Sequence, residues 1–350
     1  RCRFLFPKPD SSLSPPPPRP QTRFMLARTS LLATLLAAAA AAATEWPDCS
    51  PRADGHPPFN STRPGPFGSP VRLNATWMHR PIVVLHPTAR RAFPLLVFMH
   101  GATAKIEMYL PVLELYSSHG FVVAFPYIES PSGDTRPLTL NTNGEYILRA
   151  LDYASAAASN ASSPLHGRVD MGSVVLAGHS MGGTCAVMAG VRVPAAHEVG
   201  VRLVVTQHPG ICGPLGPPPW PSTWEEHDLR TVSSRSPLLL TTATNDGAFW
   251  PAPLTAQHER GCFKGALGGG ATGSQHPAFF VQFSTAACAE DGARRPFADA
   301  GHDCAFKAGV ETPWVLSAMK LYAQQRGRAS SRCASMLLGG GAGSLKADPL

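Results

Sequence analysis

The sequence has no internal repeat, no long apolar run beyond residues 31–43 and little net charge outside its first 43 residues. That apolar run is too short to cross a lipid bilayer comfortably, so we expect no integral membrane span in the mature chain. The chain carries a net charge of +7, to which residues 1–43 contribute six Lys and Arg against one acidic residue. The remainder is nearly neutral, so charge does not support a nucleic-acid partner, and we expect none.

The first 43 residues have the composition of material outside a folded domain. Residues 1–24 contain a run of prolines and no apolar periodicity, and we interpret them as an over-extended or disordered leader. From Met25 to Ala43, a basic residue, an apolar run and a series of alanines follow one another, which is typical of a secretory signal peptide. We therefore expect translation to start at Met25 and the protein to be secreted or to reside in the secretory lumen. A plastid transit segment is the alternative.

Export would allow glycosylation and disulfide formation. Asn-X-Ser/Thr acceptor triplets begin at Asn60, Asn74 and Asn160. Seven of the eight cysteines follow residue 43, and an odd number leaves at least one unpaired. Cys185 lies among Ala, Val and Met, so we expect a buried thiol there. Plausible disulfides join Cys262 with Cys288 and Cys304 with Cys333.

Residues 71–326 are expected to form one α/β domain. Residues 44–70 are rich in Pro and Gly and predict an irregular lead-in, and residues 327–350 predict a flexible tail. Between them strand-like segments alternate with helix-like ones, which predicts a mainly parallel sheet of about eight strands with helices on both faces. The first two strands suit an antiparallel edge. The Gly-rich residues 261–273 are expected to be a solvated inserted loop, and a lid is the alternative. Strands are expected at residues 71–77, 81–86, 95–99, 121–125, 174–178, 201–206, 238–242 and 279–283.

The most informative segment runs from Val174 to Gly183. Its apolar, β-branched first half predicts a buried strand, which leads directly into the Gly-x-Ser-x-Gly pattern centred on Ser180. The residues that follow suit a helix. A sharp strand-to-helix turn strains the central residue, and it requires Gly178 and Gly182 because side chains there would collide with neighbouring backbone. The pattern is typical of a nucleophile elbow, so Ser180 is the candidate nucleophile.

A serine hydroxyl needs a base to take its proton at neutral pH. Reactive groups of a parallel sheet gather on loops at the carboxyl ends of its strands, and hydrolases of this architecture order their triad Ser, acid, His. Asp246 follows the strand expected at 238–242, and His302 follows the last expected strand. We therefore predict a triad of Ser180, Asp246 and His302, with no metal or other cofactor. An ordinary Asp-Gly turn is the alternative for Asp246.

The tetrahedral intermediate also needs N–H donors. The amide of Met181 directly follows the nucleophile, and the amide of Ala102 is expected from the loop after the strand at 95–99. His179, His208 and Trp250 are candidates for lining the substrate pocket.

Several segments together resemble a known group of enzymes. Residues 95–126, the elbow, Thr244-Asn245-Asp246 and Gly301-His302 resemble the cutinase-like polyester hydrolases, and are also similar to the chlorophyllases and the platelet-activating-factor acetylhydrolases. The likeness covers about residues 94–325 and implies an α/β-hydrolase fold, the same triad, no metal and cleavage of a carboxylic ester. It does not choose the substrate, because polyester hydrolases usually have an aromatic residue at the position of Ala102 and chlorophyllases typically have arginine at that of Met181.

The sequence thus predicts a secreted, cutinase- or lipase-like serine esterase that forms an acyl-enzyme with a small-molecule or lipid-like ester. A chlorophyllase and a phospholipid acetylhydrolase are alternatives with the same triad. A non-catalytic binding module with the same fold is the alternative from another functional class. The oligomeric state stays open.

Overall fold

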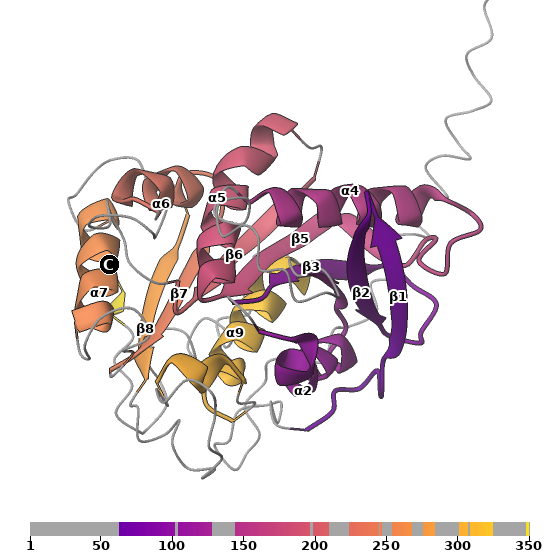
Figure 1. Cartoon of the computed structure of the whole chain (residues 1–350), viewed down its shortest axis with the longest axis horizontal. Coiled ribbons are helices and arrows are strands. Elements are labelled where there is room, and N and C mark those ends of the chain that lie inside the picture. The colour runs from indigo at the N-terminus through magenta and orange to yellow at the C-terminus, as the bar shows by residue number, and fades with distance from the viewer. Residues whose placement is uncertain are drawn as a thin grey trace, which may run out of the picture. The chain divides into compact units, whose positions relative to one another are not determined.

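A computed structural model describes most of the expected α/β domain. All the described residues lie in one unit, Trp46–Leu350, and they build a sheet with helices on both faces (Figure 1). No helix among them is long and apolar enough to cross a membrane. The described residues are 63–101, 104–127, 144–196, 199–209, 224–244, 246, 254–267, 276–283, 301–306, 309–324 and 348–349.

The sheet has nine strands in the order β1-β2-β4-β3-β5-β6-β7-β8-β9. β1 pairs antiparallel with β2, and β2 pairs antiparallel with β4, which confirms the expected antiparallel edge. All pairs from β4 through β3 to β8 are parallel, as the alternation of strands and helices predicts. The strands are β1 (Val71–Trp77), β2 (Arg80–His86), β3 (Phe93–Met99), β4 (Val122–Pro126), β5 (Val169–His179), β6 (Val201–Gln207), β7 (Leu238–Ala243), β8 (Ala278–Phe283) and β9 (Asp348–Pro349).

Helices cover the sheet in two layers (Figure 1). One layer consists of α4 (Glu145–Ser159), α5 (Met181–Ala196), α6 (Glu226–Ser233) and α7 (Leu254–Leu267). The other consists of α2 (Ile106–Ser118), the 3-10 helix η1 (His302–Phe306), α9 (Thr312–Met319) and the π-helical turn η2 (Lys320–Gln324). The sheet therefore holds a separate hydrophobic core on each face.

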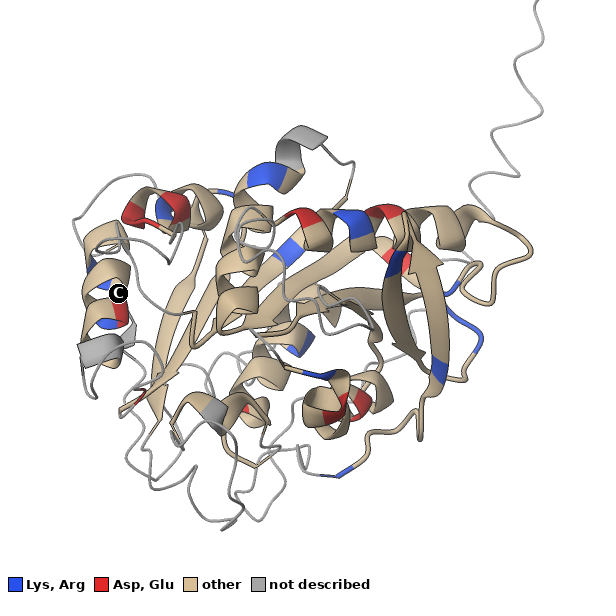
Figure 2. Ribbon diagram, in the orientation of Figure 1, with Lys and Arg blue, Asp and Glu red and all other residues tan. Residues whose placement is uncertain are grey.

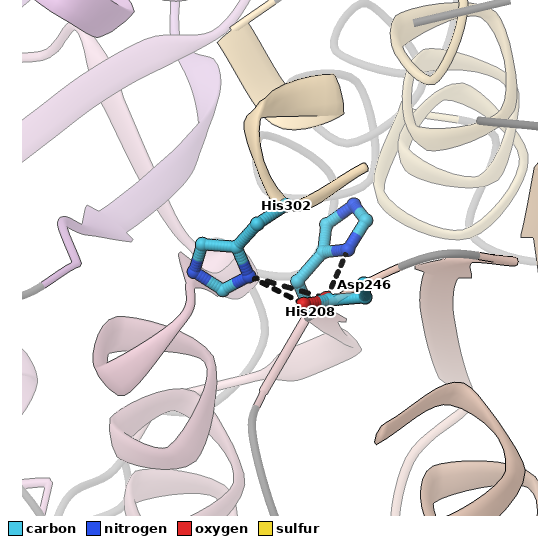
Figure 3. A group of neighbouring side chains, drawn as sticks. All are labelled: His208, Asp246 and His302. Atoms are coloured by element: carbon cyan, nitrogen blue, oxygen red, sulfur yellow. Dashed lines mark hydrogen bonds and ion pairs between the residues drawn. The ribbon is translucent and has the colours of Figure 1, made fainter. Parts of the chain in front are cut away.

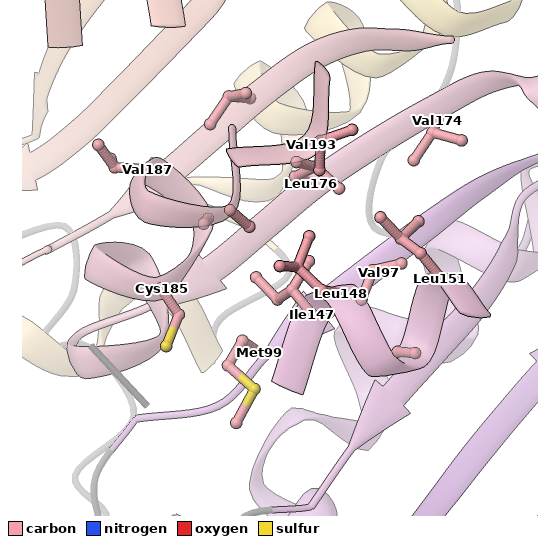
Figure 4. Close-up of a cluster of buried hydrophobic side chains, with 14 of the residues drawn as sticks. Val97, Met99, Ile147, Leu148, Leu151, Val174, Leu176, Cys185, Val187 and Val193 are labelled. Carbon is pink, nitrogen blue, oxygen red and sulfur yellow. The ribbon is translucent and has the colours of Figure 1, made fainter. Parts of the chain in front are cut away.

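Alternation along the strands divides their side chains between these two cores. In β3, Leu95, Val97 and Met99 pack under α4 and α5, whereas Leu96 and Phe98 pack against α2. Successive side chains of a strand point to opposite faces, so a strand buried on both sides is a continuous apolar run. Figure 4 shows part of the first core, where side chains from β3 and β5 meet those of α4 and α5.

Cys185 lies in this first core. Its thiol is in no disulfide and is fully buried, as predicted. The disulfide pairs stay predictions because Cys288 and Cys333 lie outside the described residues. Charged residues are concentrated on the covering helices and on the antiparallel edge, and the central strands are almost free of them (Figure 2).

Three elements differ from the expectations. The prediction of an inserted loop at 261–273 is wrong for residues 261–267, which form the second half of α7. A Cβ on Gly265 would lie 2.4 Å from Oε1 of Glu226, so this glycine faces α6 at a close approach. α6 itself was not predicted. In the tail, Asp348–Pro349 pairs antiparallel with β8 and forms the last strand of the sheet.

Candidate active site

The turn between β5 and α5 has the backbone of a nucleophile elbow. Ser180 stands between the last residue of β5 and the first residue of α5, and its φ is 56°. This left-handed conformation is uncommon for a residue other than glycine, and strained residues of this kind cluster at functional sites. Ser180 is buried, with a relative exposure of 5%.

The glycines around Ser180 are required by close backbone contacts. A Cβ on Gly178 would lie 2.1 Å from the carbonyl oxygen of Gly182, and a Cβ on Gly182 would lie 2.1 Å from that of Met99. A Cβ on Gly101 would lie 3.0 Å from Cβ of Ser180. The turn after β3 therefore lies directly against Ser180, where the sequence predicts an oxyanion donor.

Backbone hydrogen bonds extend the sheet one step beyond its strands and align the site. The amide of Ser180 donates to the carbonyl of Gln207, and the amide of His208 donates to that of Thr241, both at 2.8 Å. The amide of Asp246 then donates to the carbonyl of Ala243 at 3.2 Å, which forms a turn after β7. Residues from three successive parallel strands are thus held at one edge of the sheet.

Asp246 and His302 form a buried pair at this edge. Nδ1 of His302 lies 3.1 Å from each carboxylate oxygen of Asp246 (Figure 3). The two residues are 0% and 6% exposed. Burial alone would raise the pKa of Asp246, but the charge of His302 and hydrogen bonds from His208 and His302 hold it well below its usual range. Asp246 is therefore a carboxylate, and Nδ1–H of His302 donates to it.

A second histidine approaches Asp246 from the other side. Nδ1 of His208 lies 2.8 Å from Oδ2 of Asp246 (Figure 3). Nε2 of His208 lies 3.3 Å from Oε2 of Glu311. The other oxygen of Glu311 accepts a short hydrogen bond from the hydroxyl of Thr241. Burial alone would lower the pKa of His208, but the charge of Glu311 and the hydrogen bonds to Asp246 and Glu311 hold it well above its usual range.

His179 connects the loop of His302 to the turn after β3. The hydroxyl of Tyr109 accepts from the amide of Gly101 at 2.9 Å, so its hydrogen points to Nδ1 of His179, 2.8 Å away. Nε2–H of His179 then donates to the carbonyl of His302 at 2.9 Å. Burial lowers the pKa of His179, and the neighbouring rings of His302 and His208 lower it further when they carry positive charge. His179 is thus a neutral imidazole that holds the backbone beside His302.

The structure places most of the predicted site residues. Ser180, Asp246 and His302 lie at one edge of the sheet, and Met181 is the first residue of α5. The predictions for Ala102 and Trp250 concern residues outside the described part of the chain. His179 and His208 are 2% and 0% exposed and bind protein groups. Both side chains therefore hold other residues of the site in place and present little surface to a substrate.

Two residues of this network were not found from the sequence. Glu311 precedes Pro313 at the start of a helix, where an acidic residue is an ordinary N-terminal signal. Tyr109 occupies an apolar position of α2 and gives no sign of a polar role. Their histidine partners are distant in sequence, so only the fold reveals them.

One group among the described residues has nitrogen and oxygen atoms close enough to surround a cation. It consists of His208, Asp246 and His302, whose possible ligand atoms lie within 4.8 Å of one another. These atoms already meet at hydrogen-bonding distances of 2.8–3.1 Å. The arrangement therefore fits proton sharing, and we assign no metal site to it.

Comparison with known families agrees with this geometry. Residues 69–201 match the family model described as Chlorophyllase. The match and the sheet topology show an α/β-hydrolase fold. No curated protein matches it significantly. The matched part of the chain runs from just before β1 to the first residue of β6, so it includes Ser180 but neither Asp246 nor His302. The match supports an ester hydrolase at the level of the family.

Proposed function

We propose that the protein hydrolyses a carboxylic ester through an acyl-enzyme formed on Ser180. One observation carries this proposal: a hydrogen-bonded Asp246–His302 pair lies at the same sheet edge as a serine held at φ 56° between a strand and a helix. The nucleophile, base and orienting acid of a serine hydrolase have this arrangement.

The chemistry follows from the hydrogen bonds. Because Nδ1–H of His302 donates to Asp246, Nε2 is the nitrogen without hydrogen when the ring is neutral, and it can accept the proton of Ser180 as the serine attacks the ester carbonyl. Asp246 orients the imidazole and stabilises its charged form. His302 then donates that proton to the leaving alcohol. Water, activated by the same histidine, releases the acid and restores Ser180.

Two backbone amides are proposed to stabilise the oxyanion. The amide of Met181 lies at the N-terminus of α5, where the first N–H groups of a helix have no partner within the helix. The amide of Gly101 already donates to Tyr109, so the amide of Ala102, the next residue in the sequence, stays the candidate for the second donor. Loss of one such donor typically lowers the rate by about 10² to 10³.

Labelling with a fluorophosphonate tests the proposal. We expect the folded protein to be labelled and to hydrolyse short-chain nitrophenyl esters, and Ser180→Ala to be neither labelled nor active, with a loss on the order of 10⁶ in kcat. Labelling that persists in Ser180→Ala would place the nucleophile elsewhere. Absence of both labelling and hydrolysis in the folded wild-type protein would favour a non-catalytic binding module.

The family match favours a second candidate within the same chemistry, cleavage of the ester side chain of chlorophyll. A panel of nitrophenyl esters, a lipase substrate, an acetylated phospholipid and chlorophyll separates the candidates. A kcat/KM for chlorophyll well above that for the other esters identifies a chlorophyllase. The reverse order supports a cutinase- or lipase-like esterase.

We also propose that the protein enters the secretory pathway. Asn74 and Thr76 are both exposed on the edge strand β1, and Asn160 and Ser162 are exposed after α4, so two acceptor triplets are accessible. Expression with residues 1–43 in a eukaryotic host should give a mass that falls on treatment with an N-glycosidase and in Asn74→Gln. Import into isolated plastids without glycosylation would support the alternative destination.

A further inference from the structure

A chain of four buried ionisable residues runs through the site. Glu311, His208, Asp246 and His302 are linked in that order by hydrogen bonds of 3.3, 2.8 and 3.1 Å. Their exposed fractions range from 0% to 6%. The proposed esterase mechanism uses only Asp246 and His302, so the chemistry of ester cleavage does not by itself explain His208 and Glu311.

The hydrogen bonds determine where the protons lie. Oε1 of Glu311 accepts from Thr241, and Glu311 is the N-cap of α9, where the helix dipole favours a negative charge. Asp246 is also a carboxylate. Each ring nitrogen of His208 faces one of these two acceptors, so both nitrogens carry hydrogen and His208 is an imidazolium ion.

We propose that His208 and Glu311 are positioning residues of the hydrolytic site. His208 holds the second oxygen of Asp246, and Glu311 balances the charge of His208, so that Asp246 keeps both its orientation and its negative charge for His302. This inference rests on the proposed esterase function.

The net charge of the group shows why both residues are needed. With His302 neutral, two carboxylates and one imidazolium carry one net negative charge, and the group becomes neutral when His302 takes the proton from Ser180. Without Glu311 the same step would create a net positive charge in a buried site. Buried charge without compensation is unfavourable, so Glu311 assists the proton transfer.

Other ionisable groups near His208 are few among the described residues. The rings of His179 and His302 have centroids 5.8 and 5.7 Å from that of His208. His179 is neutral. Tyr116 lies near Glu311, whose charge adds to the effect of burial in raising the pKa of this tyrosine, so Tyr116 also stays neutral. Among the described residues, the buried charges linked to His302 by hydrogen bonds are therefore those of Asp246, His208 and Glu311.

Opposite charge changes provide the test. Glu311→Gln removes a negative charge, so we expect the acid limb of the kcat/KM profile to move to lower pH by about one unit, a tenfold change in protonation equilibrium. His208→Asn removes a positive charge and should move the limb to higher pH. Asparagine suits this position because its Nδ2 can still donate to Asp246, and because it tolerates the φ of 48° at His208. In the double variant, the acid limb of the kcat/KM profile should return to its wild-type pH.

A merely structural role would not produce this pattern. We expect Glu311→Gln to lower kcat about tenfold with KM changed less than about threefold, since the residue acts through the base and not on the substrate. Glu114→Gln makes the same change on the exposed side of α2 and is the matched control. Shifts of both single variants in one direction, no shift, or a double variant that does not return would overturn the proposal.

The charge of His208 can also be measured without catalysis. In Ser180→Ala, NMR of the 13 histidines, with His208 assigned by comparison with His208→Asn, should show this ring protonated well above pH 6.5. Ser180→Ala leaves the four linked residues unchanged, so titration of His208 near pH 6.5 in this variant would overturn the proposal. An active Ser180→Ala protein would instead refute the esterase function, so the two failures are distinguishable.

Discussion

Tyr109 and His179 lie 70 residues apart in sequence and share a hydrogen bond of 2.8 Å between the phenol oxygen and Nδ1. Because the hydroxyl of Tyr109 donates to Nδ1, this residue of α2 sets the tautomer of His179, with its hydrogen on Nε2. Since Nε2–H of that histidine holds the carbonyl of His302, the position of the proposed base depends on a tyrosine that need not contact the substrate.

Tyr109→Phe should therefore weaken both stability and turnover. The change leaves the amide of Gly101 and Nδ1 of His179 buried without their partner, which costs about 1–3 kcal/mol in the free energy of unfolding. Urea denaturation measures this loss, and kcat should fall while KM changes little. Tyr153→Phe, at a half-buried position of α4, is the control. Wild-type stability in Tyr109→Phe would show that this hydrogen bond does not support the site.

The strain at Ser180 predicts a difference between two inactive variants. Both Ser180→Ala and Ser180→Gly remove the proposed nucleophile, but only glycine adopts φ 56° without steric cost. We expect Ser180→Gly to be more stable than Ser180→Ala by about 1 kcal/mol. Thermal unfolding of the two proteins under identical conditions gives the comparison. Equal midpoints would mean that the turn stores no strain.

The raised pKa of His208 predicts a pH-dependent contribution to stability. A group that holds its proton more tightly in the folded state stabilises the fold fully below its unfolded pKa, about 6.5 for histidine, and loses this contribution as pH rises through the folded pKa. The stability lost in His208→Asn should therefore be large at pH 6 and smaller in alkaline solution. Lys320, whose pKa burial lowers to about 8, has the opposite effect but is present in both proteins. A difference between the two proteins that is constant with pH would contradict the charged His208.

Cys185 should be unreactive in the native protein. Burial raises the pKa of its thiol, and the thiolate is the reactive form. We expect iodoacetamide to leave Cys185 unmodified at neutral pH and to alkylate it fully in guanidinium chloride, as read by peptide mass spectrometry. Rapid alkylation without denaturant would show that the first core opens readily beneath the elbow.

Local patterns were sufficient to predict the strands and the elbow. The Gly-x-Ser-x-Gly turn depends on contacts among neighbours in sequence, and Asp246 and His302 follow strands whose carboxyl ends must share one edge. α7 was not predicted, and one reason is that Gly261 and Gly265 suggest a loop. In the fold, Gly265 permits the close approach of α6, and Phe263 packs on Phe280, so tertiary packing outweighs helix propensity.

The roles of His179, His208 and Glu311 could not be predicted from the sequence. Hydrogen bonds that span 103 residues, from His208 to Glu311, or 123 residues, from His179 to the carbonyl of His302, leave no periodic pattern. A histidine after a strand suggests a pocket residue until its neighbours are known. Knowledge of the parallel strand order alone would have placed His208 between Ser180 and Asp246.

The hydrogen bonds that continue the ladder past β5, β6 and β7 have a consequence for protein engineering. Ser180, His208 and Asp246 follow rigid strands, so connecting segments other than the one that carries His302 and Glu311 can be exchanged to alter substrate range without displacing these three residues. A deletion of a single residue within one of these strands would instead displace its terminal group by a full step and uncouple it from the other two.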